Sequence, residues 1–410
     1  MRIRRLATVL WTATALLVLF LLLKSFVADV YRVDSGSMRP TLFGGRDRAD
    51  GEEDAEHVLV LYGRGFAPER FDLVVVESPD GTTPLVKRVC GIPGDRDFRI
   101  RGGDLFVDRK RLPPDAPRPE PVPVYDDRYL DPERFFEFRR DGSVHREGDE
   151  WIVQGGEPSP GSLLLYHPDL RDDYFDREHR LVTGVVEVND AVLELEFSLD
   201  APLAAQKLRF QLVEEGDTFE VLLAVGPGGQ ASLRLLRRNP RTLQQSPPGE
   251  IRLAEQAVEL APGRRYALTF SNIDNTLRVR APGLGVDLTR SYAENEPWPG
   301  SLPFGHSLGS RVRFGIEAGR ARFRAVRILR DLYYTDDGTF GTQPRGGPEE
   351  PEREAATVSL GPEDYFLLGD NSAASTDSRH FGPIQAARLI GRPLAVVWPD
   401  PHWLRGVGDP

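Results

Sequence analysis

An uncharged, apolar run close to the N-terminus is the feature that most constrains what this chain can fold into. The run covers residues 6–23 and follows Arg2, Arg4 and Arg5. An α-helix of this length rises about 27 Å at about 1.5 Å per residue, which is close to the hydrocarbon thickness of a bilayer. Because arginine and lysine favour the cytoplasmic side, the sequence predicts a single-pass plasma-membrane anchor, with the N-terminus inside and the chain beyond Lys24 outside.

The alternative is a secretory signal peptide that is cleaved off. The apolar part of such a peptide is usually about 7–15 residues long and is followed by a site with small residues. Here the run is longer, and Phe26 stands where a small residue is needed in Phe26-Val27-Ala28. We therefore expect a retained anchor with a short cytoplasmic stub, in residues 1–29.

Charge and cysteine content exclude several classes of protein. The net charge is −11, and an acidic chain is a poor nucleic-acid binder because phosphate contacts need clustered lysine and arginine. The one cysteine, Cys90, permits neither an intrachain disulfide nor a cysteine metal cluster. No cofactor motif is present, so we expect no cofactor. One acidic group could bind calcium, but its spacing does not match an EF-hand loop and favours a solvated loop: Asp169, Asp172, Asp173 and Asp176.

Short β-like runs fill two regions of the chain that lie far apart in the sequence. In residues 30–112, β-branched apolar runs at 58–61 and 73–76 predict buried strands, and the Gly-Gly pair at 102–103 predicts a hairpin. Residues 357–410 return to the same pattern. We expect these regions to be the two halves of one β domain.

A different pattern separates the two halves. A Pro-rich linker and connection is predicted at 113–149, and a second linker at 336–356. Between them, residues 150–335 alternate apolar and polar side chains, as at 193–199. Strict alternation marks strands with one buried and one solvated face, and many such strands predict a β-sandwich. The predicted fold class is therefore mostly β, with a transmembrane helix and a β domain interrupted by a sandwich.

Four sequence blocks carry the candidate chemistry. They are VDSGSMRPTL at 33–42, RFDLVVV at 70–76, KRVCGIPGD at 87–95 and LGDNSAASTDSR at 368–379. Each block alone has an ordinary structural interpretation, such as a glycine turn or a surface salt bridge. In this order, behind an anchor, they resemble type I signal peptidase (leader peptidase), a serine–lysine protease that removes signal peptides from exported proteins.

The resemblance implies a role for each of several residues. Ser37 would be the nucleophile and Lys87 the general base. Ser35 would join the backbone N–H of Ser37 in an oxyanion hole, and Ser375 would orient Lys87. The buried ionic support of the site would consist of Asp370, Asp377 and Arg379.

Three positions depart from the usual pattern of that family. Ser372 stands where arginine is common, Asp34 where proline is frequent, and Cys90 where a small aliphatic residue is usual. None of the three is part of the Ser37–Lys87 pair. The departures therefore concern the fine geometry of the site rather than the activity.

These residue types suit the implied chemistry. A serine hydroxyl is a weak nucleophile and needs a base within hydrogen-bond reach. Lysine can be that base only when neutral, and burial lowers its pKa from about 10.4 because the charged form loses hydration. Val86, Val89 and Ile92 supply apolar neighbours for Lys87. Arginine could not replace it, because a guanidinium stays charged.

The short stretch between the apolar run and Ser37 limits where the site can lie. About 13 residues of chain span at most about 45 Å, so we expect the site near the outer membrane surface. A preprotein signal peptide held in the bilayer would present its cleavage site there. It would bind as an added β-strand, with small residues of the Ala-x-Ala type before the cut.

The insertion leaves other functions open. Its late part, residues 266–316, resembles concanavalin- or laminin-G-like sandwiches, which often bind sugars, but a structural or partner-docking role fits equally well. One alternative is a membrane-tethered glycan- or protein-binding module with a lapsed peptidase core. Another is a Ser–Lys protease that cuts itself or a dedicated substrate. Intact Ser37, Lys87 and Ser375 argue against a lapsed core, and the block at 87–95 favours the signal peptidase.

Overall fold

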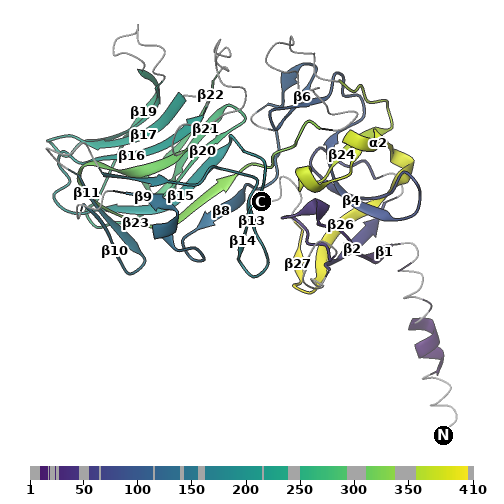
Figure 1. Ribbon diagram of the computed structural model, residues 1–410. Coiled ribbons are helices and arrows are strands. Elements are labelled where there is room, and N and C mark those ends of the chain that lie inside the picture. Colours follow the sequence, from purple (N-terminus) through teal and green to yellow (C-terminus); the bar gives the residue numbers. More distant parts are fainter. Residues whose placement is uncertain are drawn as a thin grey trace. The chain divides into compact units, whose positions relative to one another are not determined.

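The computed structural model describes two compact units (Figure 1). Unit 1 consists of Met1–Pro119 and Tyr333–Pro410, and unit 2 of Glu120–Leu332. The described segments are residues 10–16, 18, 24, 27–45, 55–63, 66–113, 116–138, 143–155, 162–214, 217–238, 250–292, 311–337 and 357–404. Most of the predicted anchor at 6–23 lies outside them, and among the described residues no helix is both long and apolar enough to cross a bilayer.

Unit 1 is built on one eight-stranded antiparallel sheet. Its strand order is β1-β2-β26-β3-β4-β24-β25, with β27 paired to β26. Strands that precede and follow unit 2 in the sequence are interleaved, since β26 lies between β2 and β3 and β24 pairs with β4. The strands are β1 Ala28–Arg32, β2 His57–Tyr62, β3 Leu73–Glu77, β4 Pro84–Gly91, β24 Asp364–Leu368, β25 Ile384–Gln385, β26 Leu389–Trp398 and β27 His402–Trp403.

Strand β4 is buried on both faces. Residues 86–91 are all buried, because β4 lies between β3 and β24 within the sheet and both of its faces are packed. Successive side chains of a strand point to opposite faces. Lys87 and Arg88 therefore enter the interior on opposite sides of the sheet, which gives two buried basic side chains next to each other in sequence.

The remaining elements of unit 1 are short. The predicted hairpin at 102–103 is confirmed, because β5 and β6 pair across these glycines. Gly103 has φ +100°, a conformation that favours glycine. The small sheet contains β5 Arg99–Arg101, β6 Asp104–Val107 and β7 Lys110–Arg111, and the helical turns are η1 Gly36–Met38, η4 Ser372–Ala374, α2 Ser378–Phe381 and η5 Ala386–Arg388.

Unit 2 is a sandwich-like arrangement centred on one long strand. Strand β23 (Val312–Arg330) pairs with β16 up to Ala318 and with β15 from Ala321 onward. Gly319 lies at this switch with φ +102°, and a Cβ there would lie 2.5 Å from the Gln206 side chain, so only glycine fits. The two halves of β23 thus contribute to two layers of one sheet system.

The other strands of unit 2 follow the order β19-β18-β17-β16-β23-β15-β20-β21-β22, with β8 to β12 attached and β13–β14 forming a separate hairpin. They are β8 Val122–Asp126, β9 Phe136–Glu137, β10 Val144–Glu147, β11 Glu150–Gly155, β12 Ser162–Tyr166, β13 Tyr174–Phe175, β14 Leu181–Val182, β15 Ala191–Leu199, β16 Lys207–Glu214, β17 Asp217–Val225, β18 Ala231–Arg238, β19 Glu250–Val258, β20 Tyr266–Ile273, β21 Thr276–Ala281 and β22 Val286–Ser291. Two short turns, η2 Pro132–Arg134 and η3 Pro282–Leu284, complete the unit.

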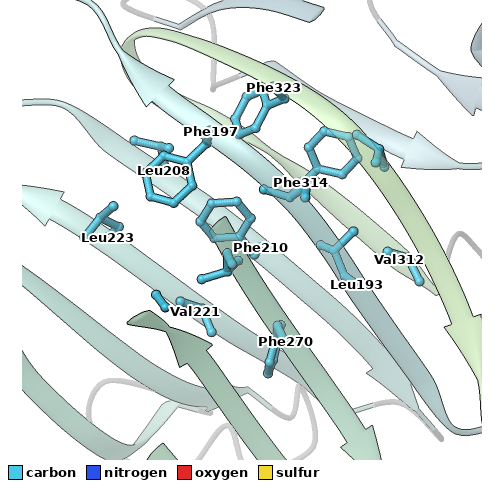
Figure 2. Packing of buried hydrophobic residues seen from close by; sticks show 14 of the residues in the cluster. Leu193, Phe197, Leu208, Phe210, Val221, Leu223, Phe270, Val312, Phe314 and Phe323 are labelled. Carbon is cyan, nitrogen blue, oxygen red and sulfur yellow. The ribbon is translucent and has the colours of Figure 1, made fainter. Parts of the chain in front are cut away.

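Aromatic side chains fill the core of unit 2 (Figure 2). The ring of Phe314 lies 5.2 Å from that of Phe323, and the ring of Phe210 lies 5.7 Å from that of Phe197. All four are buried, and they come from β23, β16 and β15. The period-two pattern predicted these strands, because alternate residues must face this core.

Two expected boundaries of unit 2 need correction, and the structure gives the contacts of the acidic group at 169–176. Residues 120–149, expected as a connection, supply β8 to β10, because Val122, Val124 and Tyr125 are buried although Pro123 interrupts the pattern. Residues 333–335, expected within the sandwich, belong to unit 1. In the acidic group, Asp172 and Asp173 accept the backbone N–H groups of Val186 and Gly184, and Asp176 pairs with Arg180, so these carboxylates close loops.

Replacing Phe314 with alanine tests the packing of this core. A fully buried phenylalanine leaves a cavity, so we expect Phe314→Ala to lower the free energy of unfolding of unit 2 by ~3–5 kcal/mol in urea denaturation. Val185→Ala is the matched control, because Val185 is 79% exposed and its loss should change stability by less than ~0.5 kcal/mol. Equal effects of the two substitutions would contradict this core.

Candidate active site

Ser37 lies in the tight turn that follows β1. It is buried within η1, and the Ser35 hydroxyl lies 3.3 Å from the Ser37 hydroxyl. Asn371 fixes this turn from the far side of the sequence: its backbone N–H donates to the Ser37 carbonyl (3.0 Å) and its Nδ2 to the Gly36 carbonyl (3.0 Å). No role was predicted for Asn371, although it belongs to the block at 368–379.

Lys87 reaches the same point from β4. Its Nζ donates to the Ser37 hydroxyl at 2.7 Å and to the Ser375 hydroxyl at 3.1 Å, and the residue is only 2% exposed. Burial lowers the pKa of Lys87 to about 8; Asp377 and Asp370 oppose this shift, and the charge of Arg379 adds to it. The three residues that the sequence assigned to nucleophile, base and orienting group are thus in direct contact.

This contact allows a proton transfer that free serine and lysine do not support. With a pKa near 8, about a tenth of Lys87 is neutral at pH 7 and about half at pH 8. In the neutral form, Nζ is able to accept the proton of the Ser37 hydroxyl. The hydrogen bond to the Ser375 hydroxyl restricts the position of Lys87 Nζ beside the Ser37 hydroxyl. The Ser35 hydroxyl, beside the nucleophile, is positioned to donate to an oxygen that develops negative charge there.

Asp377 and Arg379 form one fully buried ion pair behind Ser375. Arg379 Nε and Nη2 each lie 2.9 Å from a carboxylate oxygen of Asp377, and neither side chain is exposed. Burial raises the pKa of Asp377, but the hydrogen bonds and charge of Arg379 outweigh it, so the pKa falls below its usual range. Asp377 also accepts the Gly369 N–H (3.0 Å) and caps α2, which fixes the turn that carries Ser375.

Asp370 does not belong to that pair, and its partner is a residue that the sequence did not assign. Arg88 Nε and Nη2 bind the two oxygens of Asp370 at 2.8 and 2.6 Å, and Thr41 donates to the same carboxylate. Arg88 also donates to the Phe71 carbonyl (2.8 Å). The expected single network is therefore two separate ion pairs. The position of Arg88 next to Lys87, in the block at 87–95, was the sequence signal that could have identified it as a residue of the site.

Gly369 is required by close approach rather than by its backbone angles. A Cβ added there would lie 2.2 Å from the Ser375 hydroxyl and 2.5 Å from the Ser37 carbonyl oxygen. Contacts this short are forbidden, so any side chain at 369 would push apart the turns that carry Ser37 and Ser375. The glycine of the Gly-Asp-Asn sequence therefore lets the two serines meet at Lys87.

The three departures from the usual pattern lie around the site and do not enter it. The buried Ser372 hydroxyl accepts the backbone N–H of Thr335 at 2.9 Å. Cys90 is fully buried, and burial raises the pKa of its thiol to about 12. Asp34 is partly exposed and lies 3.6 Å from Arg32. None of the three contacts Ser37 or Lys87 in an interaction seen among the described residues.

The titration of Lys87 can be measured directly, because the sequence contains four lysines. In full-length protein labelled with ¹³Cε-lysine, we expect one NMR resonance, that of Lys87, to titrate near pH 8, because burial lowers its pKa. Lys87→Arg should remove the shifted resonance, and Lys110→Arg, on the exposed end of β7, should not. A spectrum in which no lysine resonance titrates near pH 8 would contradict a buried, neutralised amine.

Comparisons with known proteins identify one family. The family model "Signal peptidase, peptidase S26" matches residues 5–145 and 338–398. The signal peptidase I P of Bacillus subtilis subsp. natto is 35% identical over 96 residues, which are 23% of this chain and 47% of that protein. The signal peptidase I of Streptococcus pneumoniae serotype 4 is 37% identical over 99 residues, 22% of this chain and 42% of that protein.

Other similarities are shorter or weaker. The mitochondrial inner membrane protease subunit 1 of Schizosaccharomyces pombe is 41% identical over 51 residues, 12% of this chain and 31% of that protein. The matches therefore span about a third to a half of these relatives. Among solved structures, the CBM2 module of the Lactobacillus casei BL23 phage J-1 evolved Dit covers 53% of this chain and 100% of its own at 10% identity, but its TM-score of 0.34 supports no assignment.

The residues that the family model matches include all four sequence blocks that supply the residues around Lys87. Both matched stretches of the family model fall largely in unit 1, on either side of unit 2. The chain belongs to the signal peptidase family, peptidase S26.

Proposed function

We propose that this chain is a membrane-bound endopeptidase that removes N-terminal signal peptides from exported preproteins. The observation that carries the proposal is the 2.7 Å contact between Lys87 Nζ and the Ser37 hydroxyl in a buried site, where burial lowers the pKa of the amine. Family membership supports the same activity. A lapsed peptidase core is disfavoured, because Ser37, Lys87 and Ser375 keep the contacts that the reaction needs.

In the proposed reaction, neutral Lys87 takes the proton of Ser37 while its Oγ attacks the scissile carbonyl. The tetrahedral oxyanion receives hydrogen bonds from the Ser37 N–H and the Ser35 hydroxyl; loss of one such donor typically costs about 3–4 kcal/mol. Protonated Lys87 then gives its proton to the leaving amine, and an ester to Ser37 remains. Lys87 next activates a water that hydrolyses this ester. Ser375 keeps the amine in place throughout, and the ion pairs of Asp370 and Asp377 hold the surrounding turns.

Aromatic and aliphatic side chains on one part of unit 1 support a location at a membrane surface. Trp398 is 55% and Trp403 76% exposed, and Val30 and Leu61 are also exposed. They lie on β26, β27, β1 and β2, which are neighbours in the sheet. Tryptophan favours the interface between lipid and water. Since β1 starts soon after the apolar run, we propose an extracytoplasmic site close to the bilayer, with the N-terminus inside.

The proposed substrate is an extended preprotein segment that binds as an added β-strand. Main-chain hydrogen bonds would give such a strand its affinity, and small pockets would select residues such as alanine at the first and third positions before the cut. Unit 2 would then serve glycan or protein binding, or a structural role. Nothing in the chemistry at Lys87 requires a metal or a cofactor.

A cleavage assay with matched variants tests this function. Full-length protein in detergent should cleave a preprotein with an Ala-x-Ala site, whereas Ser37→Ala and Lys87→Arg should each lose at least about 10³-fold in kcat, since they remove the nucleophile and the base. Lys110→Arg and Ser291→Ala, both at exposed positions, should retain wild-type rates. Cleavage by Lys87→Arg would sink the neutral-lysine mechanism, and no cleavage by the wild type would overturn the proposed function.

The pH dependence of the rate follows from the lowered pKa of Lys87. The base acts only when deprotonated, so kcat/KM should rise about tenfold per pH unit below pH 8 and level off above it. The measurement is a pH–rate profile with chemistry rate-limiting, checked with a slower substrate. A midpoint near 10, the range of free lysine, would contradict the role of burial.

A further inference from the structure

A short segment that follows unit 2 in the sequence is bound tightly into unit 1. This return segment, residues 333–337, starts three residues after the end of β23. Tyr334 forms a β-bridge with Gly103, and its N–H lies 3.3 Å from the Gly103 carbonyl. The Tyr333 ring covers Gly103 so closely that an added Cβ would lie 2.4 Å from the ring. The backbone that leads into Thr335 is therefore fixed.

Thr335 uses its backbone and its side chain on the support of the active site. Its N–H donates to the Ser372 hydroxyl at 2.9 Å. Its carbonyl accepts from Arg379 Nη1 at 3.1 Å, and its hydroxyl is a second acceptor for the same nitrogen. Asp337 also accepts from Nη1, at 2.8 Å, but its side chain is 61% exposed. The return segment thus supplies the acceptors for one whole end of a guanidinium that has no exposure to water.

The other end of that guanidinium reaches the turn that carries Ser375. Arg379 Nη2 donates to the Ser372 carbonyl at 2.7 Å and to the Ser375 carbonyl at 3.4 Å, besides its bonds to Asp377. The hydroxyl of Ser375 in turn accepts from Lys87 Nζ. A continuous chain of hydrogen bonds therefore runs from Thr335 through Arg379 and the 372–375 turn to the amine.

We propose that Thr335 is a positioning residue of the active site, which acts through Arg379 and the 372–375 turn to hold Ser375 against Lys87. This inference rests on the proposed function. It also gives Ser372 a purpose, because its hydroxyl anchors the return segment. Thr335 lies outside the four sequence blocks, three residues after the end of unit 2 in the sequence.

Removing the Thr335 hydroxyl should weaken this chain of contacts while Ser37, Lys87 and Ser375 all remain in the site. Thr335→Val keeps the size and the backbone bonds but removes one of the three acceptors around Arg379 Nη1. It also removes the contacts of the Thr335 hydroxyl with Asp337 and with the Ser372 hydroxyl. Because small displacements of catalytic groups are costly, we expect kcat on the preprotein to fall about tenfold with KM within about twofold. As Ser375 and water adjust around the amine, the ¹³Cε titration midpoint of Lys87 should rise by about half a unit or more toward its ordinary pKa. Thr335→Ser restores a hydroxyl and should recover both quantities.

The controls separate this inference from the proposed function. Thr82→Val is the matched control, because the Thr82 hydroxyl contacts Asp80 and Thr83 in an exposed turn. If the wild type cleaves no preprotein, the proposed function fails, but the Lys87 titration of Thr335→Val still decides the positioning role. If Thr335→Val does not fold, Ser372→Ala tests the same anchor and should shift the same two quantities. A wild-type midpoint together with kcat within about twofold, or a loss that Thr335→Ser fails to recover, overturns the proposal.

Discussion

The buried amine of Lys87, held between the hydroxyls of Ser37 and Ser375, is the interaction on which the rest of unit 1 depends. A lysine charge is costly to bury, so the site is consistent with a base that sheds its proton. Two buried carboxylates lie close enough to oppose this, because a nearby negative charge raises the pKa of an amine. Each of them is bound by its own arginine, Asp370 by Arg88 and Asp377 by Arg379. The two ion pairs thus brace the turns around Lys87 while leaving desolvation as the dominant effect on its pKa.

The sheet of unit 1 explains why this arrangement tolerates an interruption of the chain. β4 carries Lys87 and pairs with β3 on one side and β24 on the other, and the turn after β24 carries the Asp370 and Ser375 side chains. The pairing partners come from both sides of unit 2, so neither half of unit 1 can bury β4 alone. Unit 2 has a separate aromatic core and satisfies its own strands. An insertion with its own core adds length between two strands without removing their contacts, and the entropy of closing a long loop grows only slowly with its length.

The return segment, which follows unit 2 in the sequence, contacts the residues that support the site in unit 1. Its Thr335 accepts a hydrogen bond from Arg379 and donates one to Ser372. Its Tyr334 is buried, and the hydroxyl of Tyr334 lies close to Cys90. Desolvation raises the pKa of Tyr334 well above its usual value. Cys90 and Ser372, which looked like isolated departures from a family pattern, are therefore neighbours of the same segment.

The sequence by itself determined the parts of this protein whose signals are local. Alternation predicted the strands of unit 2, and four ordered blocks predicted which residues surround Ser37 and Lys87. The anchor that charge and hydropathy indicate stays a prediction. Only the tertiary structure decided the pairings, because they join residues far apart in the chain: Arg88 with Asp370, Asn371 with the Ser37 turn, and Thr335 with Arg379. It also decided that residues 120–149 form strands, since burial against β23 outweighs a proline-rich composition. Local periodicity shows which side of a strand is buried, whereas the identity of the partner depends on how the whole chain folds.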